Sequence, residues 1–217
     1  MPGQQFLLIR HGQSTANASG IWQGQMEFPL SEEGRSQAQL VGKALVGERI
    51  DAIYSSPLGR AFETAEIIAR ETSFGAPVVP LEGLVERHGG SLEGTTHEER
   101  ETRHPEFTKK LLSLPEEERW TLVGAETDAE VLARFEAAIT GIRARHAHGE
   151  RLVIVSHGGA LRAFLRDRFG PTVLPGAERA ANASITHIEW HTGQTPRLLK
   201  VGCTKHLSSA PRVSITE

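Results

Sequence analysis

Short runs of consecutive hydrophobic residues recur along the chain and predict buried β-strands. Residues 6–9 and 152–155 are apolar without interruption, a pattern typical of strands that are covered on both faces, as in parallel sheets. Weaker or later strands are predicted at 51–55, 78–81, 184–190 and 197–201. The polar tail after Gly202 is expected to be loosely ordered.

Between the predicted strands, apolar residues recur at helical spacing behind N-terminal caps. Ser31 precedes an acidic first turn, and Thr127 opens a capping box that closes at Glu130, so a helix is expected to begin at each place. Further helices are expected over the apolar stripe 62–69 and from Gly158 toward Phe169. Because strands and helices alternate, the pattern favours an α/β fold.

Residues 93–119 interrupt this alternation with a strongly charged segment. Thr96 begins a second capping box, and Pro105 and Pro115 divide the rest of the segment. We expect a helical excursion from the sheet, an insert or lid at about 93–125, within a single domain spanning residues 1–217. A solvated pair of connecting helices and a substrate lid explain this segment equally well.

Charge and cysteine content narrow the class of protein. Lysine and arginine number 24 against 27 aspartate and glutamate, a net charge of −3, so no polybasic surface is available for nucleic acid or anionic lipid. Cys203 is the single cysteine, which excludes an internal disulfide, and no Cys/His cluster suggests zinc. We find no room for a signal peptide before residue 6 and no apolar run near the ~20 residues of a membrane span. A cytoplasmic protein is expected, binding neither membrane nor nucleic acid.

Two histidines stand directly after the strongest predicted strands. His11 follows 6–9 and His157 follows 152–155, and each is followed by glycine. The carboxyl ends of parallel strands meet at one edge of a sheet, where ligands bind, so both imidazoles are expected there. A single strand-terminal histidine is more often structural than catalytic.

Two arginines are expected at the same edge. Arg10 precedes His11, and Arg60 follows the strand at 51–55. Guanidinium groups at such an edge suit a phosphate dianion, which each can bind through two hydrogen bonds. The alternative for Arg60 is a surface ion pair with Glu63 or Glu66.

Four motifs together resemble the histidine phosphatase superfamily, in its phosphoglycerate-mutase-like branch. They occur in the family's order over roughly residues 5–190. Together with the strand and helix pattern, the resemblance implies a three-layer sandwich with a mostly parallel central sheet flanked by helices. The motifs are Arg10-His11-Gly12-Gln13-Ser14 with Asn17, Ser55-Ser56-Pro57-Leu58-Gly59-Arg60 with Thr64, Glu86-Arg87-His88-Gly89, and Val155-Ser156-His157-Gly158.

The resemblance implies a role for each motif residue. His11 would be the nucleophile that forms a phosphohistidine. Glu86 would protonate the leaving group and later activate water, although a loop carboxylate paired with Arg87 is the ordinary alternative. Arg10, Arg60 and His157 would surround the phosphate oxygens. No metal and no cofactor are implied. Expected substrate-binding residues are Asn17, Ser14, Gln23, Gly24, Arg87 and Gly158.

Three aromatic residues near these motifs have two interpretations. Trp22, Phe28 and Trp120 would line a pocket for an aromatic or sugar phosphate, or would pack in the core, which is the commoner role of large aromatic side chains. Histidines outside the motifs, such as His97, are expected to face solvent or to end helices.

The sequence departs from the mutases within the branch. Gly89 stands where the mutases carry tyrosine, and His97 where they carry lysine. The resemblance therefore implies a metal-independent phosphomonoester hydrolase acting on a small phosphorylated metabolite. A cofactor-dependent phosphoglycerate mutase and a non-catalytic phosphate-binding module remain alternatives. Many relatives are dimers, so a homodimer is an open alternative, although no heptad repeat argues for one.

Overall fold

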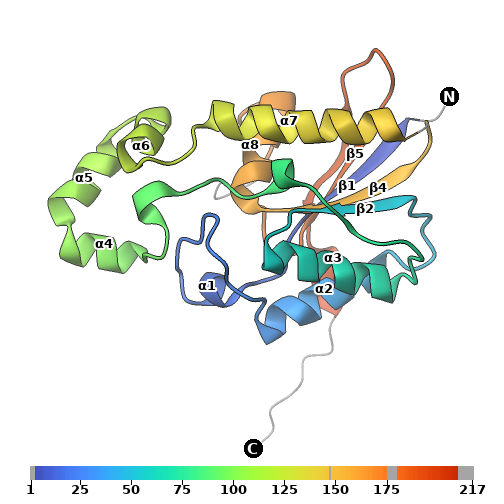
Figure 1. Ribbon diagram of the computed structural model, residues 1–217, viewed down its shortest axis with the longest axis horizontal. Coiled ribbons are helices and arrows are strands. Elements are labelled where there is room, and N and C mark those ends of the chain that lie inside the picture. Colours follow the sequence, from blue (N-terminus) through green and yellow to red (C-terminus); the bar gives the residue numbers. More distant parts are fainter. Residues whose placement is uncertain (1–2, 147, 175–179, 210–217) are drawn as a thin grey trace, which may run out of the picture.

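The computed structural model describes residues 3–146, 148–174 and 180–209. A six-stranded sheet in the order β3-β2-β4-β1-β5-β6 lies at its centre (Figure 1). The first four strands of that order run parallel, β5 is antiparallel to β1, and β6 is antiparallel to β5. The strands are β1 Gln4–Arg10, β2 Ala52–Ser55, β3 Val79–Pro80, β4 Arg151–Ser156, β5 Ile185–Trp190 and β6 Arg197–Cys203.

The hydrophobic runs are buried because both faces of the central strands are covered. Along β1, Phe6 and Leu8 belong to one apolar cluster, while Leu7 and Ile9 belong to a second cluster on the opposite face. Successive side chains of a strand point to opposite faces, so an uninterrupted apolar run fills two cores at once. This confirms the expected α/β fold with a mostly parallel central sheet.

Helices cover the two faces of the sheet (Figure 1). α2 (Glu32–Ala44) and α3 (Gly59–Glu71) contribute to the cluster that contains Leu7, whereas α7 (Asp128–Arg145) and α8 (Gly158–Phe169) contribute to the cluster that contains Phe6. The predicted caps form: Ser31 Oγ accepts from Gly34 N at 3.0 Å, and Thr127 Oγ1 accepts from Glu130 N at 3.3 Å. A four-residue helix, α1 (Thr15–Ala18), follows β1.

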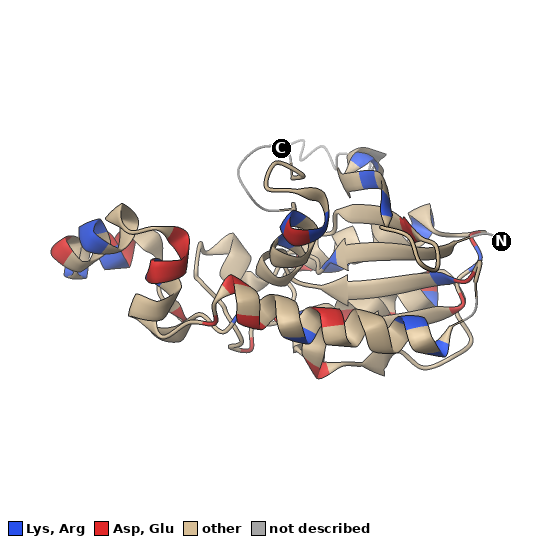
Figure 2. Cartoon of the chain, turned by 90° about the horizontal axis from the view of Figure 1, so that it is seen from above, with Lys and Arg blue, Asp and Glu red and all other residues tan. Residues whose placement is uncertain are grey.

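The charged segment forms three helices that extend from one end of the sheet (Figures 1 and 2). These are α4 (His97–Arg103), α5 (Pro105–Ser113) and α6 (Glu116–Val123), so the expected helical excursion consists of three helices. α5 and α6 share a small apolar cluster, formed by Leu111, Trp120 and Val123 with Leu92 of the short 3-10 helix η2 (Gly90–Leu92), whereas α4 has no buried residue. Blue and red residues are dense on these helices in Figure 2, since α4 has no buried residue and α5 and α6 bury only two residues each.

Two predicted elements differ in the structure. The strand expected at 78–81 reduces to β3, two exposed edge residues. Contrary to expectation, the described residues after Gly202 are ordered: β6 continues to Cys203, and a 3-10 helix η3 (Lys205–Ser209) follows, in which Leu207 packs against the apolar cluster that contains Leu7. Another 3-10 helix, η1 (Glu82–Leu84), precedes the loop of Glu86. Across the described ranges, no helix is both long and apolar enough to cross a membrane.

Candidate active site

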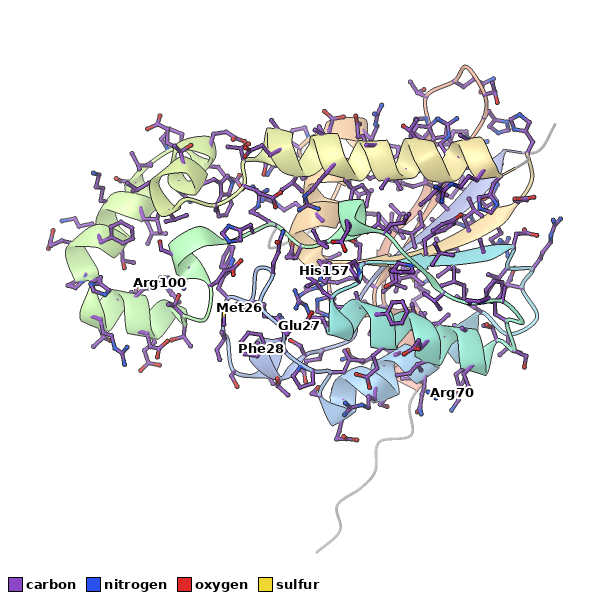
Figure 3. All side chains as sticks on the ribbon, viewed as in Figure 1. Met26, Glu27, Phe28, Arg70, Arg100 and His157 are labelled. Carbon is purple, nitrogen blue, oxygen red and sulfur yellow. The ribbon has the colours of Figure 1, made fainter. Side chains whose placement is uncertain are left out.

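The carboxyl ends of β1, β2 and β4 meet at one edge of the sheet. His11, Ser56 and His157 follow these three strands directly, because parallel strands with buried runs must end on the same side. Figure 3 shows His157 at the end of the sheet that faces α4–α6, while Arg70 lies at the far end of α3. The two predicted imidazoles are therefore neighbours, with ring centroids 5.0 Å apart.

The His11 ring is fixed in one orientation. Its Nδ1 lies 2.6 Å from Gly12 O, and because a carbonyl only accepts, Nδ1 carries the hydrogen and Nε2 retains its lone pair. The residue is 2% exposed. Burial, and then the positive charges of Arg10 and Arg60, hold the pKa of His11 well below its ordinary value. The neutral imidazole required of a nucleophile is thus the resting form.

His157 lies beneath the same site and is fully buried. Its Nε2 is 2.8 Å from Ser56 Oγ, while its Nδ1 has no hydrogen-bond partner among the described residues. Burial, followed by the charges of Arg60, His11 and Arg10, lowers the pKa of His157 well below its ordinary value. Because Nε2 is engaged by Ser56, Nδ1 is the buried ring nitrogen that has no partner among the described residues.

Arg60 is fully buried and donates to neutral acceptors. Its Nη1 reaches Met26 O at 2.9 Å and its Nη2 reaches Gly24 O at 2.7 Å; Figure 3 shows Met26 on the loop beside the His157 end of the sheet. Arg60 forms no ion pair with any described residue, and Glu63 instead receives Arg35 Nε at 2.6 Å. The surface ion-pair alternative for Arg60 is therefore wrong.

Two hydrogen bonds to its Oδ1 atom fix the orientation of the Asn17 side chain. Ser14 N, which can only donate, lies 3.2 Å from Asn17 Oδ1, and Asn182 Nδ2 donates to the same oxygen at 3.1 Å. The Nδ2 group of Asn17 is consequently directed away from both donors. Asn182 also donates to His11 O at 3.1 Å, so one side chain far along the sequence fixes two site residues.

Ser14 is buried next to the site and orients two of its residues. Its hydroxyl accepts from Asn17 N at 3.1 Å and donates to Gln23 Oε1 at 2.7 Å, and the residue has no exposed surface. The sequence predicts that Ser14 binds substrate, but the structure places it outside the cavity wall, where it orients Asn17 and Gln23.

The carboxylate of Glu86 is seated at the N-terminus of α8. Oε1 accepts from Arg87 N at 2.8 Å and from Ala160 N at 3.0 Å, while Oε2 accepts from Gly159 N at 2.9 Å. A Cβ at position 159 would lie 2.5 Å from Glu86 Oε1, so only glycine permits this seat. Helix N-termini favour negatively charged groups.

Arg87 does not pair with Glu86, contrary to the alternative drawn from the sequence. Its guanidinium instead donates to Asp128 Oδ1 and to Glu126 O, and it lies over the Trp120 ring, 4.5 Å from the centroid. The backbone of Glu86 is held separately, because its carbonyl accepts from Gln25 Nε2 at 2.9 Å and from Arg134 Nη2 at 3.0 Å.

Apart from Ser14, Ser56 and the predicted catalytic residue His157, which do not line it, these groups surround a cavity of about 610 Å³, open solvent at its mouth included. Arg10 enters the wall with Nη1 anchored on Ala180 O at 2.7 Å. Phe28, one of the aromatic candidates, is absent from the wall. The lining residues are Arg10, His11, Asn17, Ile21, Trp22, Gln23, Gly24, Arg60, Glu86, Arg87, Trp120, Gly158, Gly159 and Arg162. Sequence reasoning missed Ile21, Gly159 and Arg162 among them.

The arrangement is a cavity with two arginines in its wall at the carboxyl edge of the parallel strands of an α/β sheet, with a neutral imidazole at its base. Nowhere in 3–146, 148–174 and 180–209 do three or more His, Cys, Asp or Glu side chains gather in a way that could hold a metal ion.

Comparison with known proteins agrees with this class. The model of the histidine phosphatase superfamily (branch 1) matches residues 6–204, and the chain belongs to that superfamily and is a phosphatase of it. A metal-independent phosphoserine phosphatase of Arabidopsis thaliana is 38% identical over 83% of this chain and 74% of its own length. Phosphoglycerate mutase-like protein 4 of the same plant is 33% identical over 94% and 86%. The structure of Bacillus stearothermophilus YhfR matches with a TM-score of 0.78 at 31% identity, covering 94% of this chain and 99% of that one.

Proposed function

We propose that this phosphatase hydrolyses small phosphomonoesters through a phosphohistidine formed at Nε2 of His11. The observation that carries the proposal is the 2.6 Å contact between His11 Nδ1 and Gly12 O, which presents the Nε2 lone pair of a buried, neutral ring. In the first step, Nε2 bonds to phosphorus as the ester P–O bond breaks. In the second, water attacks phosphorus and the N–P bond breaks, releasing inorganic phosphate and the free imidazole.

Four groups would hold the oxygens of the transferred phosphoryl group. Arg10 and Arg60 supply positive charge, Asn17 supplies amide N–H donors, and Nδ1 of His157 supplies a further donor. Fixed donors in a buried site stabilise transition-state charge strongly, because they need no reorganisation during the reaction. Arginine charge can take the part that a divalent cation has in other phosphoryl-transfer sites, so the proposed reaction proceeds in the presence of EDTA.

Glu86 would serve as the acid and then as the base. Oε1 already accepts two N–H groups, whereas Oε2 accepts only that of Gly159, so a proton is most readily held on Oε2. That proton passes to the departing alkoxide, and the resulting carboxylate then removes a proton from the attacking water.

The substrate is proposed to be a small phosphorylated metabolite. The relative named for phosphoserine hydrolysis makes O-phosphoserine the first ester to test. The mutase alternative gains support from the relative named as mutase-like. Against it, His97, at the place of the mutase lysine, lies on the exposed side of α4 and contacts Glu101 at 3.2 Å, away from the cavity.

The test is phosphate release from a panel of monoesters in EDTA, comparing the wild type with His11→Ala. A matched control is His187→Ala, since His187 is a partly buried imidazole that lies on β5, does not line the cavity and forms a hydrogen bond with Gln5 Oε1. We expect His11→Ala alone to abolish release, and acid-labile phosphate to be trapped on the peptide containing His11 in the wild type. Full activity in His11→Ala would refute the proposal.

A second assay separates the alternatives. If no ester is hydrolysed, conversion of 3-phosphoglycerate in the presence of 2,3-bisphosphoglycerate would identify a mutase. Phosphate binding without either reaction would identify a binding module.

A further inference from the structure

The loop after α1 pairs with the residues that lead into the α4–α6 excursion. Trp22 N donates to Thr95 O at 2.9 Å, and Gly94 N donates to Trp22 O at 2.8 Å. Ile21 and Thr96 form an isolated antiparallel bridge beside these bonds. Because Ile21 and Trp22 line the cavity, the start of the excursion is bonded directly to the cavity wall.

Glu93 precedes this pairing and joins the same loop to the loop of Glu86 through one carboxylate oxygen. Its Oε1 accepts from Gln25 N at 2.9 Å and from Gly89 N at 2.7 Å. Gly24 has a positive φ of 52°, and a Cβ there would lie 1.9 Å from Glu93 Oε1. Glycine at this position therefore allows the loop to lie against the carboxylate.

The two loops carry different parts of the site. Arg60 donates to the carbonyls of the residues on either side of Gln25, so the loop of Gln25 fixes the position of that guanidinium. Glu86 lies three residues before Gly89, and its backbone carbonyl accepts from Gln25 Nε2 at 2.9 Å. The Glu93 carboxylate thus connects the loop that holds the proposed phosphate-binding arginine to the loop that carries the proposed acid.

Hydrogen bonds, more than charge, connect Glu93 to these loops. Burial lowers the pKa of Arg60, and Glu93 is the smallest of the three carboxylate charges that oppose this effect. Both donors to Glu93 Oε1 are backbone N–H groups, which carry no net charge. Its Oε2 accepts no hydrogen bond from a described residue, so a side-chain amide can replace the carboxylate and keep both contacts.

Resting on the proposed phosphatase function, we propose that Glu93 is a positioning residue for the acid. Its Oε1 holds the loop of Glu86 at a fixed distance from the loop that binds Arg60, so that the acidic proton lies beside the departing ester oxygen. Glu93 does not line the cavity and acts only through these loops. Because residues 94–96 follow it directly, the α4–α6 excursion is fixed to the loop of the acid.

Two esters that differ in their need for an acid test this role. An alkoxide, as released from O-phosphoserine or another alkyl ester of the panel, requires a proton, whereas p-nitrophenolate departs readily without one. The comparison uses kcat/KM, which contains the transition state of the step that breaks the ester bond. We expect Glu93→Ala to lower kcat/KM on the order of 100-fold for the best alkyl ester, but less than about tenfold for p-nitrophenyl phosphate.

Two conservative variants separate hydrogen bonding from charge. Glu93→Gln loses the charge but keeps an oxygen that accepts from both N–H groups, so it should retain the wild-type ratio of the two esters. Glu93→Asp keeps the charge but is shorter by one methylene group, so it should show the selective loss of Glu93→Ala. The aspartate variant also covers the case in which the alanine variant folds poorly.

Glu99→Ala is the matched control from the same segment. Glu99 Oε2 also accepts from a backbone N–H group, that of Thr96 at 2.8 Å, but the residue does not line the cavity and caps α4 locally. Its replacement should lower the free energy of unfolding and leave the ratio of the two esters unchanged.

Two results would overturn the inference while leaving the proposed function intact. These are a wild-type ratio of the two esters in Glu93→Ala, and a ratio that changes in Glu93→Gln but not in Glu93→Asp. Absence of hydrolysis of every ester by the wild type would refute the proposed function, and this positioning role with it.

Discussion

Thr64 offers a direct test of how the loop after His11 is held against the rest of the fold. Its hydroxyl accepts from Gly12 N at 3.1 Å and donates to Arg60 O at 2.7 Å, and the residue has no exposed surface. One side chain thus joins the residue after His11 to the helix turn that carries Arg60. Thr64→Val preserves the shape of the side chain and removes both hydrogen bonds.

The expected cost depends on which groups lose partners. The carbonyl of Arg60 lies within α3 and keeps its helical acceptor role, but Gly12 N is buried and loses the hydroxyl that accepts its hydrogen bond. An unsatisfied buried donor costs about 1–3 kcal/mol, so the free energy of unfolding should fall by that amount. The loop would also be held less tightly, and displaced catalytic groups lose rate steeply, so kcat/KM should fall on the order of tenfold.

Thr72→Val on the same side of the fold is the control. Thr72 Oγ1, at the C-terminal end of α3, also donates back to a carbonyl four residues earlier, Ile68 O at 2.8 Å, but it accepts from no distant N–H among the described residues. The backbone N of Thr72 keeps its own bond to Ile68 O, so this change should cost well under about 1 kcal/mol. Urea denaturation and phosphate release measure both variants. Equal losses of stability and activity in the two variants would refute the reasoning, because the hydrogen bond from Gly12 N would then contribute nothing measurable.

Two further predictions concern the buried histidines and the seat of Glu86. Burial holds the pKa of His11 and His157 well below 6.5. Below pH 6.5 the unfolded chain therefore takes up protons that the folded chain does not. For each histidine, the free energy of unfolding should decrease by about 1.4 kcal/mol for every unit by which the pH is lowered. An undiminished slope in His11→Gln would contradict this. Gly159→Ala should abolish most phosphatase activity by displacing the Glu86 carboxylate, whereas Gly141→Ala, where no atom lies within 4 Å of the added Cβ, should keep activity and stabilise α7 by about 0.5–1 kcal/mol.

The elements that the sequence predicted well are those fixed by neighbouring residues. The run at 6–9 is buried on both faces, and Ser31 and Thr127 cap helices at the expected positions. Each depends on periodicity or on a cap three residues away, which is local information. The predicted strand at 78–81 is too long, because its residues lie at the edge of the sheet, where they are exposed and their hydrophobic pattern is not fixed by burial.

The contacts that orient the site depend on residues far apart in sequence. Arg87 pairs with Asp128, 41 positions later, in place of the adjacent Glu86. Asn182 reaches His11 O from 171 positions away. Arg162 resembles any charged residue on an amphipathic helix until α6 brings Glu116 against it. No local pattern distinguishes these side chains, since only the packed fold gives them their partners.

Arg60 shows how this fold prepares the site for an anion. Its guanidinium is fully buried and donates to two carbonyls, while its Nε has no partner among the described residues. Burial lowers the pKa of Arg60, and only the more distant charges of Glu86, Glu27 and Glu93 oppose that effect. A buried cation without a direct counter-ion is destabilising, whereas carbonyl acceptors fix its position without cancelling its charge. If a phosphate dianion binds there as proposed, it would supply the missing counter-ion. The burial that destabilises the free protein would then strengthen the attraction between Arg60 and the ligand.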